Sequence, residues 1–293
     1  MEERYMGNPI IDALFTTGAV RVCEPDQPFW YTSGTLGPFY INTHFLFGSE
    51  REATDLLLLI EEAAYADRIS FIDVLLQALL RQYENNATYK LVIDRIVDEA
   101  SALSFDFISG GERRDFFFSV LPAYFLKKPH LSIFKDMQAV YTNATFTESI
   151  PVYEVPMAGK RALHIADLVT EASSYTRAWI PVIREFGGVM EDTIAVVNRK
   201  QGGEQILRDE QVILHAFVDI DNTLFQSAVD IGVITEAQRA LVQGFMEQPS
   251  AFMAKFLETH PDFIANEINK GGKARERAEL AISKGYAKGI TCS

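Results

Sequence analysis

Short apolar runs alternate with longer stretches of helical spacing over residues 105 to 220. The runs typical of strands are Phe105–Ile108, Leu131–Phe134, Arg161–Ile165, Thr193–Val197 and Gln211–Ile220. Strands that alternate with helices in this way are joined by right-handed crossovers and form a mainly parallel sheet. The sequence therefore predicts an α/β fold in which helices flank a parallel sheet.

The residues before this alternation fall into two parts. Near residues 25 to 50, a pattern of Gly, Pro and aromatic residues predicts two short strands, Phe29–Tyr31 and Phe39–Ile41, joined by a turn-rich loop. From Ser49 to about Leu103, apolar residues recur at helical spacing and predict two or three helices. We expect the first part to form an N-terminal hood.

The residues after the alternation again have helical character. Between Asp221 and Gly289, prolines and glycines separate the helical stretches. The separating residues are Pro249, Pro261, Gly271 and Gly272. We expect an α/β domain over residues 1–220, which includes the hood, and a helical C-terminal extension over residues 221–293.

Composition and charge argue against several classes of protein. Hydrophobic residues make up 48% of the chain, which is enough to build a core without metals or disulfides. The 40 acidic residues outnumber the 27 basic ones, so no nucleic-acid partner is expected. The N-terminus does not have the pattern of a signal peptide, and no apolar run is long enough to span a membrane. Since Cys23 and Cys292 are too few for a disulfide framework, we expect a cytoplasmic protein without a membrane partner.

The loop after the strand Arg161–Ile165 carries the polar residues best suited to a ligand site. In parallel α/β sheets, ligands bind beyond the carboxyl ends of the strands. Here Asp167 follows the strand, and a helix is predicted over Tyr175–Phe186. The hydroxyl residues between them are Thr170, Ser173 and Ser174. Because a helix start offers unpaired N–H groups and the hydroxyls add donors, this loop suits a phosphate group.

Five segments of the chain resemble, in the same order, those of type I phosphoribosyltransferases, and they are most similar to orotate phosphoribosyltransferases. The segments, over roughly residues 25 to 220, are SGTLGPFYIN, FDFISGGERRDFF, KKPHLSIFKD, GKRALHIADLVTEASS and VVNRKQGG. The resemblance implies a phosphoribosyltransferase-type parallel sheet and a homodimer in which a loop of one subunit reaches the other's site. It also implies phosphoribosyl diphosphate and a pyrimidine base or nucleotide as small-molecule partners, with Mg²⁺ as cofactor if the protein is active.

The same resemblance implies roles for individual residues. Asp167 would hold the ribose hydroxyls, and Lys135 is the lysine that remains in the catalytic loop. The phosphate-binding residues would be Thr170, Ser173 and Ser174, and the residues lining the base pocket would be Phe39 and Tyr40. No residue is assigned as a direct metal ligand.

Several positions depart from the pattern of the family. Ala166 stands where the family has the first of two acids, and Glu171 lies in what is there a small glycine turn. A carboxylate about 4 Å from a phosphate opposes it by about 4 kcal/mol at an effective dielectric constant near 20, which is roughly a thousandfold in affinity. In the catalytic loop, Gln138 and Val140 replace two basic residues. We therefore expect a transfer activity that is weak or altered.

Plainer interpretations of the loop after the strand stay open. Residues 167–174 can simply be a helix start, with Thr170 as the N-cap and Glu171 stabilised by the helix dipole. Alternatively, the Glu171 carboxylate occupies the anion site itself and mimics a phosphate. These interpretations leave the loop without a phosphate ligand.

The other candidate residues have plainer interpretations as well. Phe39 and Tyr40 can be core aromatic residues, and Lys135 can be a solvated lysine. The two acids and two arginines of Glu112–Asp115, where the family has small residues, favour a surface loop that neutralises its own charges.

A competing motif lies at Asp219–Phe225. Its sequence DIDNTLF satisfies the D-x-D-x-T pattern of haloacid-dehalogenase-like phosphatases. No later strand ends in paired acids to complete a metal site, so we interpret Asp219 and Asp221 as a strand end and a helix cap. The histidines, at positions 44, 130, 164, 215 and 260, include no i, i+4 pair and do not indicate a histidine metal site.

Two functional hypotheses follow from the sequence. The first is an orotate-phosphoribosyltransferase-like protein that binds a phosphoribosyl group or transfers it to a pyrimidine-type base. The second is a non-catalytic protein of the same fold that binds a nucleotide or sugar phosphate or serves in assembly.

Overall fold

The computed structural model describes residues 8–286, and its contacts divide the chain into two compact units. The sheet unit comprises residues 1–19 and 42–224, and the second unit comprises residues 20–41 and 225–293. The central part of the expected hood thus groups by its contacts with the C-terminal helices.

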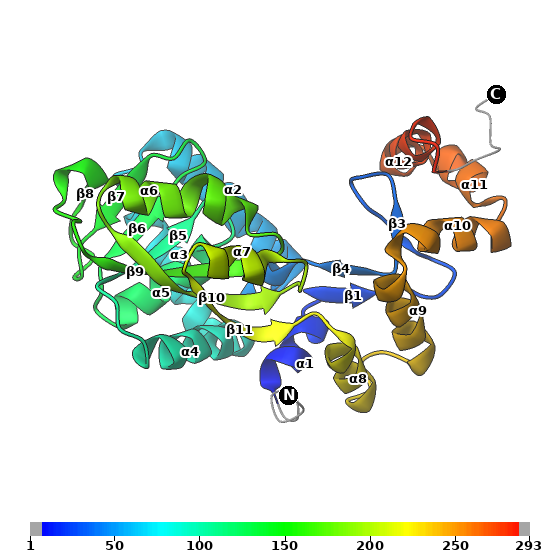
Figure 1. The fold of residues 1–293 in the computed structure, drawn as a ribbon, viewed down its shortest axis with the longest axis horizontal. Coiled ribbons are helices and arrows are strands. Elements are labelled where there is room, and N and C mark those ends of the chain that lie inside the picture. Colours follow the sequence, from blue (N-terminus) through cyan, green and yellow to red (C-terminus); the bar gives the residue numbers. More distant parts are fainter. Residues whose placement is uncertain (1–7, 287–293) are drawn as a thin grey trace. The chain divides into compact units, whose positions relative to one another are not determined.

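A mainly parallel sheet, with seven strands within residues 8–286, forms the centre of the sheet unit (Figure 1). The strand order is β11-β10-β9-β5-β6-β7-β8. The strands are β5 (Phe107–Gly111), β6 (His130–Ile133), β7 (Ala139–Thr142), β8 (Ser149–Pro151), β9 (Arg161–Val169), β10 (Val189–Asn198) and β11 (Ile213–Asp219). Neighbours from β11 to β6 are parallel, whereas β7 is antiparallel to both β6 and β8. The predicted α/β fold with a parallel sheet flanked by helices is therefore confirmed.

The five strands predicted from the apolar runs all form, with ends shifted by a few residues. Strands β7 and β8 were not predicted. They are short, and β8 ends at Pro151, which removes a backbone donor from this edge of the sheet.

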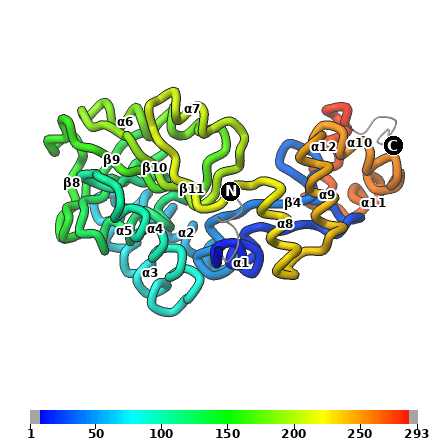
Figure 2. The backbone as a smooth tube through the Cα atoms, turned by 60° about the horizontal axis from the view of Figure 1, so that its bottom comes forward, coloured from blue at the N-terminus to red at the C-terminus, as the bar shows by residue number. Residues whose placement is uncertain are grey.

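Helices cover the sheet and pack on one another (Figure 2). The helices of this unit are α1 (Pro9–Thr16), η2 (Thr43–Phe47), α2 (Glu50–Ala66), α3 (Phe71–Asn85), α4 (Ala87–Ser101), α5 (Phe116–Phe125), η3 (Val152–Glu154), η4 (Tyr175–Trp179), α6 (Ile180–Glu185) and α7 (Gly203–Asp209). Helix α5 packs against strands β5, β6 and β9 and against helices α3 and α4. Its sequence FFFSVLPAYF is apolar all round, as expected of a helix buried between other elements.

The second unit joins short strands to the C-terminal helices. Strand β1 (Val20–Val22) pairs with β4 (Phe39–Ile41), and β2 (Phe29–Trp30) pairs with β3 (Leu36–Gly37). The helices are α9 (Glu236–Glu247), α10 (Pro249–Thr259), α11 (Phe263–Lys270), α12 (Gly272–Ser283) and most of α8 (Asn222–Asp230), whose first three residues belong to the sheet unit. Strand β3 and helices α10, α11 and α12 share a buried core that consists of Leu36, Met253, Phe256, Ile264, Ala278 and Ala281.

Two expectations about the whole chain can be compared with the described part. No helix within residues 8–286 has both the length and the apolar character that a membrane crossing requires. Cys23 is a buried free thiol, whereas Cys292 lies outside the described residues.

Candidate functional site

A cavity of about 280 Å³ lies in the sheet unit beyond the carboxyl ends of β5, β6 and β9. Three loops line it, because neighbouring parallel strands end at the same edge of the sheet. They contribute the segment Glu112–Asp115 after β5, Lys135 after β6 and the segment Ala166–Tyr175 around the end of β9. Trp179 completes the lining.

The loop after β9 is held in place by a close backbone contact. The N–H of Gly203 donates to the carbonyl oxygen of Thr170 at 3.0 Å. A Cβ atom at Gly203 would lie only 2.6 Å from that oxygen, so only glycine fits here. Ala172, in the middle of the loop, has φ +51°, a conformation that costs a non-glycine residue about 1 to 2 kcal/mol. The loop therefore has a fixed shape rather than that of a solvated turn.

Three hydroxyl residues lie close together after β9. Thr170, Ser173 and Ser174 all line the cavity. Helical residues begin at Ser173, and the side chain of Ser174 makes no capping hydrogen bond to the helix. Glu171 also lines the cavity and is exposed. One surface thus carries three hydroxyl donors and one carboxylate.

Two buried acids meet on the floor of the cavity. The Oδ1 atom of Asp115 accepts a hydrogen bond from the backbone N–H of Asp167 at 3.1 Å, and the two side chains line the same space. Asp115 is 8% exposed and Asp167 is 7% exposed. The Oδ2 atom of Asp167 has no hydrogen-bond partner among the described residues. Burial, together with the charge of Asp115, raises the pKa of Asp167 to about 8.

Asp115 is held by groups beneath the cavity. Its Oδ2 atom accepts a hydrogen bond from the backbone N–H of Gly111 at 3.2 Å and lies 3.4 Å from Nε2 of His164. His164 is fully buried, is hydrogen-bonded through Nδ1 to the hydroxyl of Ser109 at 2.9 Å, and stacks against Trp179. These contacts restrict the orientation of the Asp115 carboxylate.

Three basic residues, Arg113, Arg114 and Lys135, also line the cavity, and they come from the loops after β5 and β6. Lys135 forms an ion pair with Glu112, with 3.3 Å between Nζ and Oε1, and its backbone N–H also donates to Glu112. Arg113 is paired with Glu61. For Arg114 we find no ion pair within residues 8–286, and its charge opposes the upward shift in the pKa of Asp167. Arg114 is therefore the cation best placed to meet an anionic ligand.

Phe39 and Tyr40 lie in the second unit and are not among the residues that line this cavity. Phe39 is buried and packs against Phe225 and Phe245, with ring centroids 5.3 and 5.8 Å apart. The hydroxyl of Tyr40 donates to the carbonyl of Trp30. The buried ring of Phe39 corresponds to the interpretation as a core aromatic residue, whereas Tyr40 is half-buried and packs against Phe29 and Tyr31.

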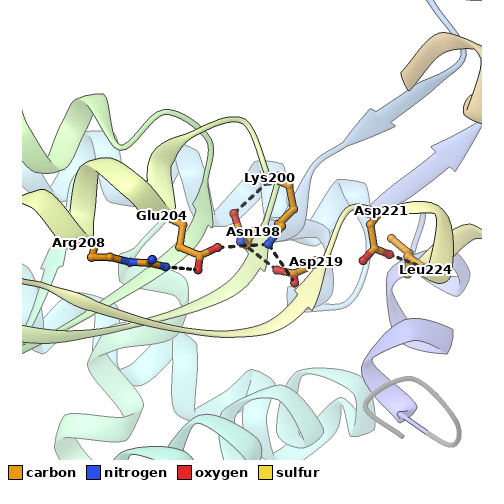
Figure 3. A network of polar contacts seen from close by, with 7 residues as sticks. All are labelled: Asn198, Lys200, Glu204, Arg208, Asp219, Asp221 and Leu224. Atoms are coloured by element: carbon orange, nitrogen blue, oxygen red, sulfur yellow. Dashed lines mark hydrogen bonds and ion pairs between the residues drawn. The ribbon is translucent and has the colours of Figure 1, made fainter. Parts of the chain in front are cut away.

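The competing aspartate motif has a structural role in this chain (Figure 3). Asp219 is the last residue of the edge strand β11, where it accepts a hydrogen bond from Asn198 at 2.9 Å and lies 3.8 Å from Nζ of Lys200. The Oδ1 atom of Asp221 accepts a hydrogen bond of 3.0 Å from the backbone N–H of Leu224, which lies in the first turn of α8. The two acids are thus the strand end and the helix cap that the sequence indicated.

The sequence did not assign Asp115 to the site. Its neighbours Glu112, Arg113 and Arg114 favoured an exposed loop, yet the carboxylate is buried against Asp167. One feature of the sequence could have indicated that Asp115 is buried: it directly precedes the apolar run Phe116–Phe118. Among the described residues, no three His, Cys, Asp or Glu side chains converge to hold a metal ion by themselves.

No family model matches the chain, but it is similar in sequence to curated orotate phosphoribosyltransferases. It is 25% identical over 229 residues to the orotate phosphoribosyltransferase of Rhizobium johnstonii, a match that covers 78% of this chain and 82% of that protein. It is 26% identical over 145 residues to the orotate phosphoribosyltransferase of Saccharolobus solfataricus, covering 50% of this chain and 70% of that protein.

A solved structure matches the fold. The UMP synthase of Leishmania donovani superposes with a TM-score of 0.57 and 18% identity over 84% of this chain. The chain spans 43% of that protein's length. At this identity the match bears on the fold alone. The chain is therefore similar in sequence to orotate phosphoribosyltransferases, and its fold is similar to that of a solved UMP synthase.

Proposed function

We propose that the protein binds phosphoribosyl diphosphate in the cavity beyond β5, β6 and β9 and transfers its phosphoribosyl group to orotate or a related pyrimidine base. The observation that carries the proposal is the convergence of Asp167, Lys135 and the hydroxyl loop on one cavity. The similarity to orotate phosphoribosyltransferases over 78% of the chain supports the same reaction.

Each wall of the cavity has a separate task in this proposal. The hydroxyls of Thr170, Ser173 and Ser174 donate hydrogen bonds to the 5-phosphate of the ligand. Asp167 contacts the ribose hydroxyls. The bond between the sugar C1 atom and the diphosphate breaks as a bond to a base nitrogen forms, and Arg114 offsets the charge of the departing diphosphate.

The residues at the cavity floor fit a magnesium ion. The Oδ2 atom of Asp167 is buried without a hydrogen-bond partner among the described residues, and Mg²⁺ prefers oxygen ligands of this kind. Such an ion, when bound, supplies positive charge that stabilises the diphosphate as it leaves.

We infer that transfer is slow. Glu171 places a carboxylate on the surface that would meet the 5-phosphate, and Lys135 is already paired with Glu112. Both features reduce the stabilisation available to an anionic transition state.

The proposal is tested by following the loss of orotate absorbance when the protein is incubated with orotate, phosphoribosyl diphosphate and Mg²⁺. We expect turnover that Asp167→Ala abolishes. The matched control is Asp209→Asn, which removes one negative charge from an exposed position on α7 and should keep the activity. Absence of turnover in the unmodified protein would refute the transferase.

One observation favours a second candidate, a non-catalytic binder of a nucleotide or sugar phosphate. Lys135, a cation of the cavity, is already paired with Glu112, and Glu171 adds a carboxylate to the surface that carries the hydroxyl residues. A binder of this kind predicts no turnover, together with an upward shift of the melting temperature on addition of phosphoribosyl diphosphate or uridine monophosphate.

A homodimer and a cytoplasmic location form part of the same proposal, and both rest on the family resemblance. Light scattering coupled to size-exclusion chromatography tests the first of these. A mass of twice 32.9 kDa is the expected result.

A further inference from the structure

The second unit contains a cavity of its own, with a volume of about 890 Å³. Pockets that hold drug-sized ligands have volumes of about 300 to 1,000 Å³. The cavity lies where strand β3 packs against helix α10 (Figure 1). Helix α9 and the segments that follow α10 and α12 complete its lining. The second unit can therefore enclose a small molecule without any residue of the sheet unit.

Three aromatic rings, those of Tyr31, Phe245 and Tyr286, line this cavity. The rings of Tyr31 and Phe245 meet edge to face, with centroids 6.2 Å apart. The position of Tyr31 is fixed, because its hydroxyl donates to the carbonyl of Phe39 at 2.7 Å and its ring leaves no room for a Cβ atom at Gly37. This aromatic wall is therefore in place before a ligand arrives.

Glu258 carries the one charge on the lining within residues 8–286. It is exposed on α10 and forms no hydrogen bond or ion pair with the described residues. Two basic side chains, Arg277 and Lys284, contact the turn before β3, but they donate to the carbonyl oxygens of Thr32 and Ser33, at 2.8 and 3.0 Å. Neither lines the cavity, which thus offers a ligand one negative charge and no positive charge.

Aromatic rings beside a single carboxylate attract an organic cation. The faces of the rings attract an ammonium group, and the carboxylate adds a direct attraction between charges. Much of the remaining lining is apolar and includes Leu36, Met253 and Leu257, so a sizeable apolar body can be buried beside the charge. We propose that this cavity binds an organic cation in which an ammonium group carries an alkyl or aromatic body. Phosphates are disfavoured, because they would meet Glu258 without a neutralising cation.

The test is a ligand-observed NMR titration of the full-length protein with octyltrimethylammonium, octanol and octyl sulfate. These probes share one apolar chain and differ in charge. We expect the ammonium to bind most tightly and the sulfate most weakly. The affinity for the ammonium should fall as the salt concentration rises, because salt screens an exposed carboxylate.

Glu258→Gln isolates the contribution of charge. It should weaken binding of the ammonium about three- to ten-fold, leave octanol nearly unchanged and strengthen binding of the sulfate. Glu276→Gln is the matched control, since Glu276 is exposed on α12 and does not line the cavity. This control should change the three affinities little.

Ala254→Phe identifies the place of binding. Ala254 is exposed on α10 and lines the cavity, so a phenyl ring there occupies the space without entering a packed core. Each of the three probes should lose affinity by about ten-fold or more, while the melting temperature stays that of the unmodified protein. Tyr286→Leu keeps an apolar side chain but removes an aromatic face, and it should weaken ammonium binding about two- to five-fold and octanol binding less.

Equal binding of the three probes would overturn the proposal, as would ammonium binding that Glu258→Gln leaves unchanged. Ammonium binding that survives Ala254→Phe would place the probe elsewhere and would also overturn it. A dimer that Ala254→Phe converts to a monomer would show that a second copy of the chain covers the cavity, with the same consequence. The site does not depend on the proposed transfer reaction, so Asp167→Ala should abolish turnover and keep ammonium binding.

Discussion

At the scale of single residues, His130 shows how the sheet unit tolerates a polar side chain in its core. It is fully buried on β6, and its ring nitrogens are hydrogen-bonded to the hydroxyls of Ser119 at 3.0 Å and Ser132 at 3.1 Å. Burial, aided by the nearby His164, lowers the pKa of His130 to about 3. The neutral imidazole is thus part of the folded state.

This burial makes stability depend on pH. Between the ordinary pKa of 6.5 and the folded value of about 3, the unfolded chain binds one more proton at position 130 than the folded chain does. Stability is therefore lost as the pH falls, by about 1.4 kcal/mol per pH unit from this residue. Urea unfolding at a series of pH values below 6.5 gives the slope of the free energy of unfolding against pH. His130→Gln should reduce this slope by about the same amount. An unchanged slope in the variant would contradict the assignment.

At the scale of elements, the loop between β9 and η4 was the most predictable part of the site. Thr170, Ser173 and Ser174 follow the buried strand β9, and Asp167 lies within its last residues rather than after the strand as the sequence predicted. The chain order alone places these residues at a sheet edge. Asp115 could not be predicted in the same way, because its partner is 52 residues away and its neighbours in sequence are charged. Strands β7 and β8 were missed because runs of four and three residues carry little periodic signal.

The shape of this loop depends on Gly203. A Cβ atom there would lie 2.6 Å from the Thr170 carbonyl oxygen and 3.0 Å from the Ala172 nitrogen, both backbone atoms. We expect Gly203→Ala to cost about 1 to 3 kcal/mol of stability and to weaken diphosphate binding by displacing the loop. Thermal unfolding and calorimetric titration with inorganic diphosphate measure the two effects.

A glycine without this constraint provides the control for Gly203→Ala. Gly244 lies within helix α9, and a Cβ atom there would meet nothing within 4 Å. Gly244→Ala should stabilise the protein by about 0.5 to 1 kcal/mol. If neither substitution changed the stability, the close contact at Gly203 would not be what fixes the shape of the loop.

At the scale of the whole molecule, the division into two units depends on contacts far apart in sequence. The indole N–H of Trp30 donates to Oε2 of Glu267 at 2.7 Å, across 237 residues of chain. The amide of Gln238 donates to the carbonyl of Cys23 at 3.3 Å. Local sequence patterns predicted the C-terminal helices, but such patterns contain no information on contacts between distant residues. For that reason our sequence prediction placed residues 20–41 in the same domain as the sheet.

Glu267 offers a test of the second unit. Its carboxylate is buried, accepts from Trp30 and is paired with Lys270. Glu267→Ala leaves a buried indole N–H without its acceptor and should destabilise this unit by about 1.5 to 3 kcal/mol. The chain has two tryptophans, and Trp179 lies in the sheet unit, so the Trp179→Phe background leaves the fluorescence of Trp30 as the reporter.

The paired lysine supplies the comparison for Glu267→Ala. The side chain of Lys270 is 66% exposed, and exposed ion pairs contribute little to stability. Lys270→Ala should therefore change the midpoint of the unfolding transition only slightly. An equal loss in the two variants would argue against the Trp30 hydrogen bond as the stabilising contact.

The most direct test of the central claim is a crystal structure of the protein with phosphoribosyl diphosphate and Mg²⁺. We expect the 5-phosphate against Thr170, Ser173 and Ser174, and the diphosphate between Arg114 and the acid pair of Asp115 and Asp167. A cavity in which the Glu171 carboxylate fills the hydroxyl loop and no ligand is bound would contradict the claim.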